Sequence, residues 1–392
     1  MLFAKILFFT GIFIILYSYA GYGLLVWALI KARNLLKGRP VKKYSADLPP
    51  VTLIIAAYNE ESFIEEKIQN TLSLDYPSDK LDIIFITDGS TDNTPLIAGR
   101  YKQIRVLHQP ERKGKIAAMH RAMGTVKTPI VIFCDANTLL NKECISMIVR
   151  HYNDPKVGGV AGEKKILSTA GGKITGAGEG LYWKYESMLK KLDADFYTVV
   201  GAAGELFSIR TSLYEPVDDN VLLDDFIISL KICRKGYRIE YEPGAYASEN
   251  PTTSMMEEKK RKIRISAGAF QSMVMLKDLL NIFKYPLLSF QYLSHRVLRW
   301  TLCPVFLPII FILNIVLAVR ENAPLYRVIL AGQIIFYMAA IIGWILSEKK
   351  IKVKLLYIPY YFFFQNVSLY LGFIRYRKGQ QSVLWEKAGR QQ

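Results

Sequence analysis

Cysteine and acidic residues are both scarce in this sequence, and each scarcity narrows the classes of protein that it can encode. Four cysteines occur in 392 residues, and none belongs to a CxxC pair: Cys134, Cys144, Cys233 and Cys303. A zinc site or a disulfide framework is therefore not expected, and reduced thiols fit the cytoplasm. Asp and Glu total 34 against 51 Lys and Arg, which gives a net charge of +17. No nucleic-acid-binding motif accompanies this charge, so nucleic acid is not an expected partner.

Apolar residues are abundant in spite of that charge. Hydrophobic residues make up 51% of the sequence, and the mean hydropathy is +0.16. Disorder requires low hydrophobicity, so a disordered polyelectrolyte is excluded. A chain that is both apolar and basic is most simply a membrane protein with a large cytoplasmic part, where Lys and Arg collect.

Four uncharged apolar runs are each long enough to cross a bilayer as a helix, which takes about 20 residues. They lie at 6–30, 300–319, 328–347 and 355–374. We predict one N-terminal transmembrane helix within residues 1–30, about three transmembrane segments within 300–374, and a basic tail at 375–392. Two alternatives stay open: buried core helices for all four runs, and a signal peptide cleaved after Ala20 for the first.

Basic flanks predict which side of the membrane faces the cytoplasm. Six Lys and Arg occur from Lys31 to Lys43 and four Lys from Lys349 to Lys354, so both stretches are predicted to be inside. Four complete crossings would then put the basic tail outside, against the same rule. The fourth run also carries Pro359 and polar side chains, so it is either a re-entrant segment or the lining of a channel.

Residues 276–299 mix apolar side chains with Lys284, His295, Arg296 and Arg299. This composition predicts an interfacial amphipathic segment broken at Pro286. A surface helix of the soluble domain would show the same pattern, and the sequence leaves that alternative open.

Residues 31–275 have the pattern of a separate α/β domain in the cytoplasm. Apolar, β-branched strands are predicted at 51–57, 81–87, 104–107 and 129–134, with helices at 60–72, 93–101 and 115–123. Strands that alternate with helices form a parallel sheet, and ligands bind beyond the carboxyl ends of such strands. Three polar loops follow predicted strands, at 58–60, 88–92 and 135–137.

These loops and the segment after the third strand combine carboxylates, small polar side chains and lysines. The residues are Asn59, Asp88, Ser90, Lys113, Lys115, Asp135 and Asn137. Carboxylates with neutral oxygens suit a hard divalent cation, and lysines suit phosphate groups. The combination predicts a metal–diphosphate site, although each aspartate taken alone could be an ordinary turn residue.

Three later segments are further candidates. Small residues at 201–204, followed by Glu205, allow a ligand to approach the backbone closely. The pair Asp224–Asp225 precedes a helical pattern, where mutual repulsion raises one pKa and suits a general base. An acidic first turn of a helix is the alternative for that pair. Arg261 and Arg264 lie in a basic stretch that suits either a diphosphate or lipid headgroups.

The order of these motifs resembles that of family 2 glycosyltransferases. The motifs are Ala56-Ala-Tyr-Asn-Glu-Glu61, Thr87-Asp-Gly-Ser-Thr-Asp-Asn-Thr94, Lys113-Gly-Lys115, Cys134-Asp-Ala-Asn137, Gly201-Ala-Ala-Gly204 and Asp224-Asp225. The membrane layout resembles the branch with cellulose, hyaluronan and poly-N-acetylglucosamine synthases. The resemblance covers about residues 51–270 and implies a Rossmann-like α/β fold of the GT-A type that binds a nucleotide-sugar.

The resemblance also implies roles for individual residues on the donor side. Base and ribose of the nucleotide would be lined by Ala57, Tyr58 and Glu60, with Asp88 on the uracil side. Lys115 would contact the donor. Asp135 would contact the nucleotide and, together with Asn137, would hold Mg²⁺ or Mn²⁺. Arg261 and Arg264 would bind the diphosphate, as in the family's QxxRW motif.

On the acceptor side, Asp225 would deprotonate the acceptor hydroxyl beside Asp224. The residues expected to line the acceptor are Gly201, Ala202, Ala203, Gly204 and Glu205. Three positions depart from the family pattern: Asn137 replaces the last carboxylate of the DxD motif, and Arg261 and Ile265 stand where QxxRW has its Gln and its Trp. In related synthases that Trp lies near the acceptor sugar, so its absence weakens the case for processive polymerisation.

The resulting expectation is an inverting, metal-dependent glycosyltransferase of the cell (inner or plasma) membrane. It would move a sugar from a nucleotide-diphosphate sugar, UDP-sugar being favoured, to a growing polysaccharide, with or without translocation. Single transfer to a lipid-linked acceptor is the alternative, and an inactive membrane scaffold or transport component is a remote one. Membrane lipids and accessory or export subunits are the remaining expected partners.

Overall fold

The computed structural model describes residues 1–38, 48–167, 174–250, 255–349, 351 and 353–380. The chain divides into two compact units, which are described separately. One comprises Met1–Lys31, Thr169–Tyr182 and Ser254–Gln380; the other comprises Ala32–Ser168, Trp183–Thr253 and Gln381–Gln392. The first contains the apolar helices and is called the helical unit. The second contains the sheet and is called the α/β unit.

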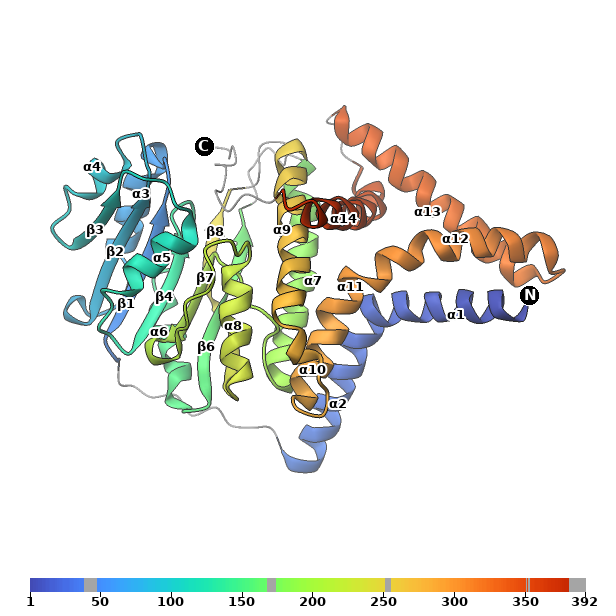
Figure 1. Cartoon of the computed structure of the whole chain (residues 1–392), viewed down its shortest axis with the longest axis horizontal. Coiled ribbons are helices and arrows are strands. Elements are labelled where there is room, and N and C mark those ends of the chain that lie inside the picture. The colour runs from blue at the N-terminus through green and yellow to red at the C-terminus, as the bar shows by residue number, and fades with distance from the viewer. Residues whose placement is uncertain (39–47, 168–173, 251–254, 350, 352, 381–392) are drawn as a thin grey trace. The chain divides into compact units, whose positions relative to one another are not determined.

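The α/β unit is built on one mixed sheet of eight strands in the order β3-β2-β1-β4-β7-β6-β8-β5 (Figure 1). The strands are β1 (Val51–Ala57), β2 (Leu81–Asp88), β3 (Ile104–Gln109), β4 (Ile130–Asp135), β5 (Leu139–Leu140), β6 (Val157–Ile166), β7 (Leu206–Arg210) and β8 (Arg238–Glu249). Strands β1 to β4 are mutually parallel. Strand β7 runs antiparallel to β4 and β6, while β8 is parallel to β6.

Helices lie between most successive strands in the chain, and the first three of them connect the parallel strands β1 to β4. They are α3 (Glu61–Leu72), α4 (Thr94–Ala98), α5 (Lys115–Met123), α6 (Cys144–Val149) and α8 (Asp224–Arg234), with α7 (Ile174–Phe196) between β6 and β7. Alternate residues of β1 point to one face, where Leu53 and Ile55 pack with Ile64 and Ile68 of α3 in a fully buried core. The four predicted strands and three predicted helices are confirmed.

The strand order reverses between β1 and β4, and this reversal positions the site. The connections β1-α3-β2 and β2-α4-β3 move outward in one direction. The connection through α5 returns to β4 on the other side of β1. Because such crossovers are right-handed, α5 covers the opposite face from α3 and α4. The carboxyl ends of β1 and β4 therefore flank a crevice of the kind that binds nucleotides.

The helical unit consists of α1 (Leu2–Leu16), α2 (Tyr22–Lys37), α9 (Met255–Met275), α10 (Pro286–Tyr292), α11 (Leu298–Trp300), α12 (Leu302–Arg320), α13 (Pro324–Glu348) and α14 (Lys354–Arg377). One π-helical turn, Tyr17–Gly21, joins α1 to α2. Helices α1 and α12 approach closely, because a Cβ at Gly11 would lie 2.5 Å from a side-chain atom of Ile310. Phe8, Leu317 and Tyr326 complete the buried core between α1, α12 and α13.

Three helices of the described chain are long and apolar enough to cross a membrane. They span Leu2–Lys37, Leu302–Arg320 and Pro324–Glu348. An apolar N-terminal helix is confirmed, and two C-terminal helices qualify where about three were predicted. The fourth apolar run is helical, as α14, yet its polar residues keep it out of this group. Helix α14 packs along α9, where a Cβ at Gly372 would lie 2.4 Å from Cβ of Ser266.

The predicted interfacial segment contains α10, which begins at Pro286. A proline is well suited to the first helical position, so the expected break is a helix start. Just before it, Ile282 and Phe283 are 52% and 96% exposed, whereas Leu288 and Tyr292 are buried within the unit. The segment thus has a buried apolar face on α10 and exposed apolar side chains just before this helix. Residues 381–392 of the predicted basic tail lie outside the described residues.

Candidate active site

The loops after β1 and β2 are bound to each other by side-chain hydrogen bonds. Asn59 adopts a left-handed conformation, with φ of 53°, and its Oδ1 accepts a hydrogen bond from the backbone N–H of Thr91 at 2.8 Å. The N–H of Glu60 donates to Thr94 Oγ1 at 2.8 Å, and Glu60 is buried. Asparagine tolerates positive φ better than other side chains do, which explains the residue at this turn. The predicted nucleotide residues Tyr58 and Glu60 therefore occupy a rigid loop.

Asp88, at the end of β2, organises the loop that leads into α5. It is fully buried, and its carboxylate accepts hydrogen bonds from the N–H groups of Lys113 at 3.1 Å and Gly114 at 2.6 Å. Gly89 has φ of +65°, and a Cβ there would lie 2.6 Å from Cβ of Arg112. Only glycine fits this crossing. These hydrogen bonds show that the Asp88 carboxylate stabilises the loop before α5. Its predicted contact with uracil stays a prediction.

Lys115 and Asp135 meet at the crevice between β1 and β4. The ammonium nitrogen Nζ of Lys115 lies 2.5 Å from Asp135 Oδ1, and the two side chains are 24% and 31% exposed. Burial raises the pKa of Asp135, while the ammonium of Lys115 opposes that rise. Burial alone would lower the pKa of Lys115, but the carboxylates of Asp135, Asp224 and Asp225 outweigh it and raise the pKa. The ammonium is therefore a fixed positive charge at neutral pH.

A buried lysine that the sequence analysis did not single out supports the turn after β4. Lys67 of α3 has no exposed surface, and its ammonium donates to Thr138 O at 2.8 Å and to Cys134 Sγ at 3.1 Å. Thr138 Oγ1 in turn donates to Asp135 O at 3.0 Å. These bonds brace the turn that carries Asp135 and Asn137. In sequence, Lys67 looks like a solvent-facing residue of an amphipathic helix, so no signal marks it.

The small-residue loop 201–205 runs beside the acidic pair. Gly201 has φ of +87°, and a Cβ there would lie 2.0 Å from the ring of Phe226. The N–H of Ala202 donates to Ser229 Oγ of α8 at 3.1 Å. A Cβ at Gly204 would lie 3.3 Å from Asp225 Oδ2 and 3.4 Å from Lys115 Nζ. The structure thus brings together Gly204, Asp225, Lys115 and, through Lys115, Asp135.

Asp224 and Asp225 open α8, so the acidic first turn and the candidate base coexist. Burial and then the neighbouring charge of Asp224 raise the pKa of Asp225 to about 7, against the opposing charge of Lys115. Asp224 Oδ2 is buried and has no hydrogen-bond partner among the described residues. A carboxylate with a pKa near neutrality can accept a proton at physiological pH, which is the property a general base requires.

Arg261 and Arg264 lie on α9, in the helical unit, so their predicted contact with a diphosphate stays a prediction. Arg261 forms a salt bridge with Glu258 of the same helix at 3.0 Å. Glu258 is buried and also lies 3.9 Å from the ammonium of Lys262. The metal prediction likewise stays a prediction: among the described residues, no three His, Cys, Asp or Glu side chains are grouped as metal ligands.

Comparison with known proteins identifies the domain. Residues 52–218 match the family model described as glycosyl transferase family 2. This segment is a family 2 glycosyltransferase domain. It contains all but the first residue of β1, the strands β2 to β7, and the loops that carry Asp88, Asp135 and Gly204.

Two curated relatives of the family 2 domain were compared along their length. A poly-beta-1,6-N-acetyl-D-glucosamine synthase of Staphylococcus aureus is 26% identical over 249 residues, which is 61% of this chain and 58% of the relative. A protein named as a probable glycosyltransferase of Bacillus subtilis is 26% identical over 274 residues, which is 64% of this chain and 61% of the relative. The chain therefore spans about three fifths of the length of these relatives.

One solved structure shares the fold over nearly the whole chain. It is a mannosyltransferase from Pyrobaculum calidifontis in complex with GDP-mannose and Mn²⁺, with a TM-score of 0.70 and 22% identity. The match covers 96% of this chain and 100% of that one. The likeness supports a GT-A-like mixed sheet accompanied by apolar helices.

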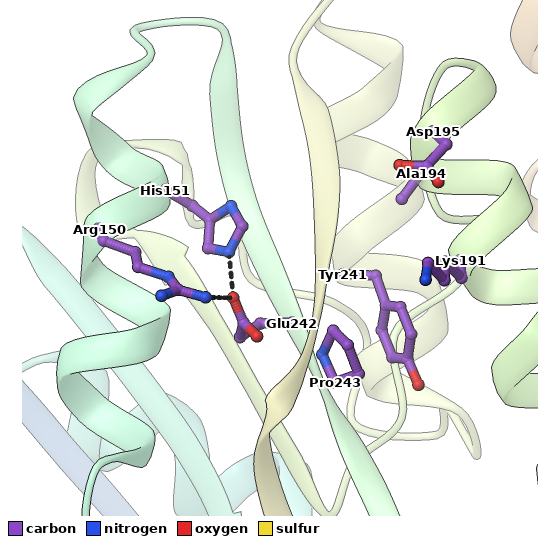
Figure 2. A pocket seen from close by; sticks show the side chains of 8 residues that line it. All are labelled: Arg150, His151, Lys191, Ala194, Asp195, Tyr241, Glu242 and Pro243. Carbon is purple, nitrogen blue, oxygen red and sulfur yellow. Dashed lines mark hydrogen bonds and ion pairs between the residues drawn. The ribbon is translucent and has the colours of Figure 1, made fainter. Parts of the chain in front are cut away.

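A pocket of about 260 Å³ also opens in the α/β unit, and none of the predicted site residues lines it. Figure 2 shows Glu242 between Arg150 and His151 on one wall, with Lys191 and Asp195 of α7 opposite. Glu242 accepts hydrogen bonds from His151 Nε2 at 2.7 Å and from Arg150 at 2.5 Å. Burial alone would raise the pKa of Glu242, but these bonds lower it to about 2. We interpret the trio as a structural ion cluster.

Proposed function

We propose that the protein is an inverting glycosyltransferase that moves a sugar from a nucleotide-diphosphate sugar to an acceptor hydroxyl at the membrane. One observation carries the proposal. Asp225, with its pKa near neutrality, adjoins Gly204 and Lys115 at the strand ends where a family 2 domain binds its donor. A base and a cation beside the same small-residue loop suit attack by a hydroxyl and departure of a diphosphate.

The chemistry assigned to the chain's own residues follows from their charges. Asp225 accepts the proton of the acceptor hydroxyl, whose oxygen then attacks the anomeric carbon from the side opposite the diphosphate, so the configuration inverts. Lys115 keeps its charge and donates to a departing phosphate oxygen. Gly204 lacks a side chain, so the backbone of the loop can approach both Asp225 and Lys115 closely. Asp224 supplies the second negative charge that keeps the pKa of Asp225 high.

The charges at the site also fit a divalent cation. The carboxylates of Asp135, Asp224 and Asp225 act on the single ammonium of Lys115, so these four groups carry a net negative charge. Asp135 and Asn137 would hold Mg²⁺ or Mn²⁺ by oxygen ligands, and the solved mannosyltransferase contains Mn²⁺. When bound, the metal would neutralise the charge that develops on the leaving diphosphate.

The topology proposed here has three crossings and a cytoplasmic catalytic domain. The ammonium of Lys5, at the start of α1, lies 2.9 Å from Glu321, just after α12. This ion pair supports a topology in which the start of α1 and the end of α12 lie at the same, outer face of the membrane. If α14 does not cross, the chain after α13 stays inside, and the conflict between span count and basic tail disappears. Packing of α14 on α9, a helix rich in Lys and Arg, supports a position at the cytoplasmic face.

Polysaccharide synthesis is the favoured reaction, supported by the likeness to poly-beta-1,6-N-acetyl-D-glucosamine synthase. Single transfer to a lipid-linked acceptor is the second candidate. One observation favours it: Ile265 stands at the position of the motif Trp.

A donor screen tests the proposal. Purified full-length protein is incubated with UDP- and GDP-sugars, Mg²⁺ or Mn²⁺, and lipid or oligosaccharide acceptors, and nucleotide diphosphate release is measured. Release with one donor and its suppression by EDTA would support the proposal. No release with any donor would favour an inactive scaffold. Product length then separates the two reactions, since a single added sugar would exclude polymer synthesis.

A further inference from the structure

A lysine of the α/β unit lies between two carboxylates next to the proposed acceptor loop. Lys164, on β6, has a side chain with no exposed surface, and its ammonium lies 2.5 Å from Glu205 Oε1. The same ammonium contacts Glu249 Oε1, and the side chains of Glu205 and Glu249 are 16% and 2% exposed. A buried charge is stable only when it is paired. Loss of Lys164 would leave two carboxylates side by side in a poorly solvated space.

The three charged groups come from three segments that meet at one end of the sheet. Lys164 lies near the end of β6, and Glu249 is the last residue of β8. The two strands are paired there, with Ile166 opposite Glu249. Glu205 directly precedes β7, which pairs with β6 further along. The ion pairs therefore connect the loop 201–205 to two strands of the sheet by contacts that backbone pairing does not supply.

An aromatic side chain covers the lysine. The ammonium of Lys164 lies 5.0 Å from the ring centroid of Trp183, on α7. This distance is within the range in which a cation is attracted to an aromatic ring. The side chain of Lys164 has no exposed surface, so its ion pairs are less screened than pairs on the surface. A fixed geometry is the expected consequence for the Glu205 carboxylate.

Glu205 is adjacent in sequence to the glycine that faces the base. Gly204 lies against Asp225 Oδ2 and Lys115 Nζ, as described above. The other end of the loop is held by the bond from Ala202 N–H to Ser229 Oγ. The loop is thus fixed at Ala202 and at Glu205, and Gly204 lies between these points. A displacement of about 1 Å between reacting groups can reduce turnover about 100-fold.

We propose that Lys164 is a positioning residue of the transfer reaction: by holding Glu205 together with Glu249, it keeps Gly204 and the acceptor at the correct distance from Asp225. This inference rests on the proposed function. It assigns Lys164 no contact with substrate. It differs from a general role in stability, because it predicts a defect limited to the loop and to acceptor use.

The test uses a charge-balanced variant of the full-length protein. The double substitution Lys164→Met with Glu249→Gln removes one positive and one negative charge, so Glu205 is not left beside an unpaired carboxylate. Lys164→Arg keeps the positive charge and should retain most of the transfer activity that the double variant loses. Lys165→Met is the matched control, because Lys165 is exposed on the same strand and its ammonium lies over the ring of Tyr246.

Three measurements test the positioning role of Lys164. They are steady-state kinetics, nucleotide diphosphate affinity, and hydrogen exchange of the peptide that covers 200–206. In the double variant we expect kcat to fall about 10- to 100-fold and the acceptor KM to rise. We expect nucleotide affinity to stay within about twofold and amide exchange at 201–205 to accelerate. Lys164→Arg should recover most of the turnover, and Lys165→Met should resemble the wild type.

Two results would overturn the inference. One is a double variant whose loop exchanges at the wild-type rate; the other is a loss of nucleotide affinity that parallels the loss of turnover, which would indicate a general structural role. If the wild-type protein transfers no sugar at all, the proposed function fails. The exchange measurement still decides whether Lys164 holds the loop, so the two failures can be told apart.

Discussion

Replacement of the proposed base should make the protein inactive and, at the same time, more stable. In Asp225→Asn the side chain keeps its size but can neither accept the acceptor proton nor carry a buried charge. Turnover should fall by at least about 100-fold, the lower range for loss of a general base. Affinity for a nucleotide diphosphate should be preserved, because Asp225 is assigned to the acceptor side.

The gain in stability follows from the raised pKa. A rise in the pKa of Asp225 from 3.8 to about 7 corresponds to about 4 kcal/mol above pH 7, at about 1.4 kcal/mol per unit. Partial exposure of the side chain reduces this cost, and we expect about 2 kcal/mol. The folded state binds more protons than the unfolded state between these two pKa values. The stability of the wild type therefore declines as pH rises from about 4 to 7, and that of Asp225→Asn lacks this decline.

Thermal unfolding in detergent, followed from pH 4.5 to 8, measures the effect. The difference in Tm between Asp225→Asn and wild type should grow with pH and reach about 4–8 °C, since 1 kcal/mol shifts Tm by about 2–4 °C at this size. Asp79→Asn, at an exposed position before β2, should stay within about 1 °C of wild type throughout. A variant that keeps its turnover, or whose Tm difference does not depend on pH, would refute the reasoning.

Three further substitutions test other parts of the structure. Glu242→Gln should destabilise the fold by about 3 kcal/mol at pH 7, because the pKa of Glu242 is lowered in the folded state. This stability is present above about pH 4.5 and is lost as pH falls towards 2. The difference in Tm between wild type and Glu242→Gln should therefore shrink in acid. Gly201→Ala should lower Tm by several degrees, since its Cβ would overlap the ring of Phe226 at positive φ. Lys115→Met should weaken nucleotide diphosphate binding about tenfold, measured by calorimetry, through loss of a charge-assisted hydrogen bond; unchanged affinity would remove Lys115 from the donor site.

The parallel half of the sheet was predictable because its signal is local. Strands such as β1 and β2 are buried on both faces, so their sequences are continuous β-branched runs ended by polar loops. The antiparallel half was not predicted as strands. Strand β6 begins Val157-Gly-Gly, and β7 has five residues, so neither has a clear periodicity. These strands are specified by pairing with distant partners, which periodicity within a short window does not reveal.

The candidate site was likewise predictable from sequence only in part. The carboxylates of Asp88, Asp135 and Asp225 could be located from their positions after strands or at a helix start. The hydrogen-bond partners of these carboxylates could not be predicted. Asp88 accepts from backbone N–H groups, whereas Asp135 pairs with the ammonium of Lys115. Lys67 and Lys164 gave no signal, because a lysine in sequence is ordinarily solvated. Only the packing of α3 and β6 shows that both are buried.

By itself the sequence determined the chemistry available and the environments of its segments: a basic α/β domain with acidic loops, between apolar helices. Composition and hydropathy suffice for this, because the partition of side chains between water, protein interior and lipid depends on each residue and its near neighbours. Only the tertiary structure decided that Gly204 adjoins Asp225, that Lys164 connects Glu205 to Glu249, and that α14 packs along α9. Those contacts join residues far apart in the chain, and their energies depend on distances and burial that exist only after folding.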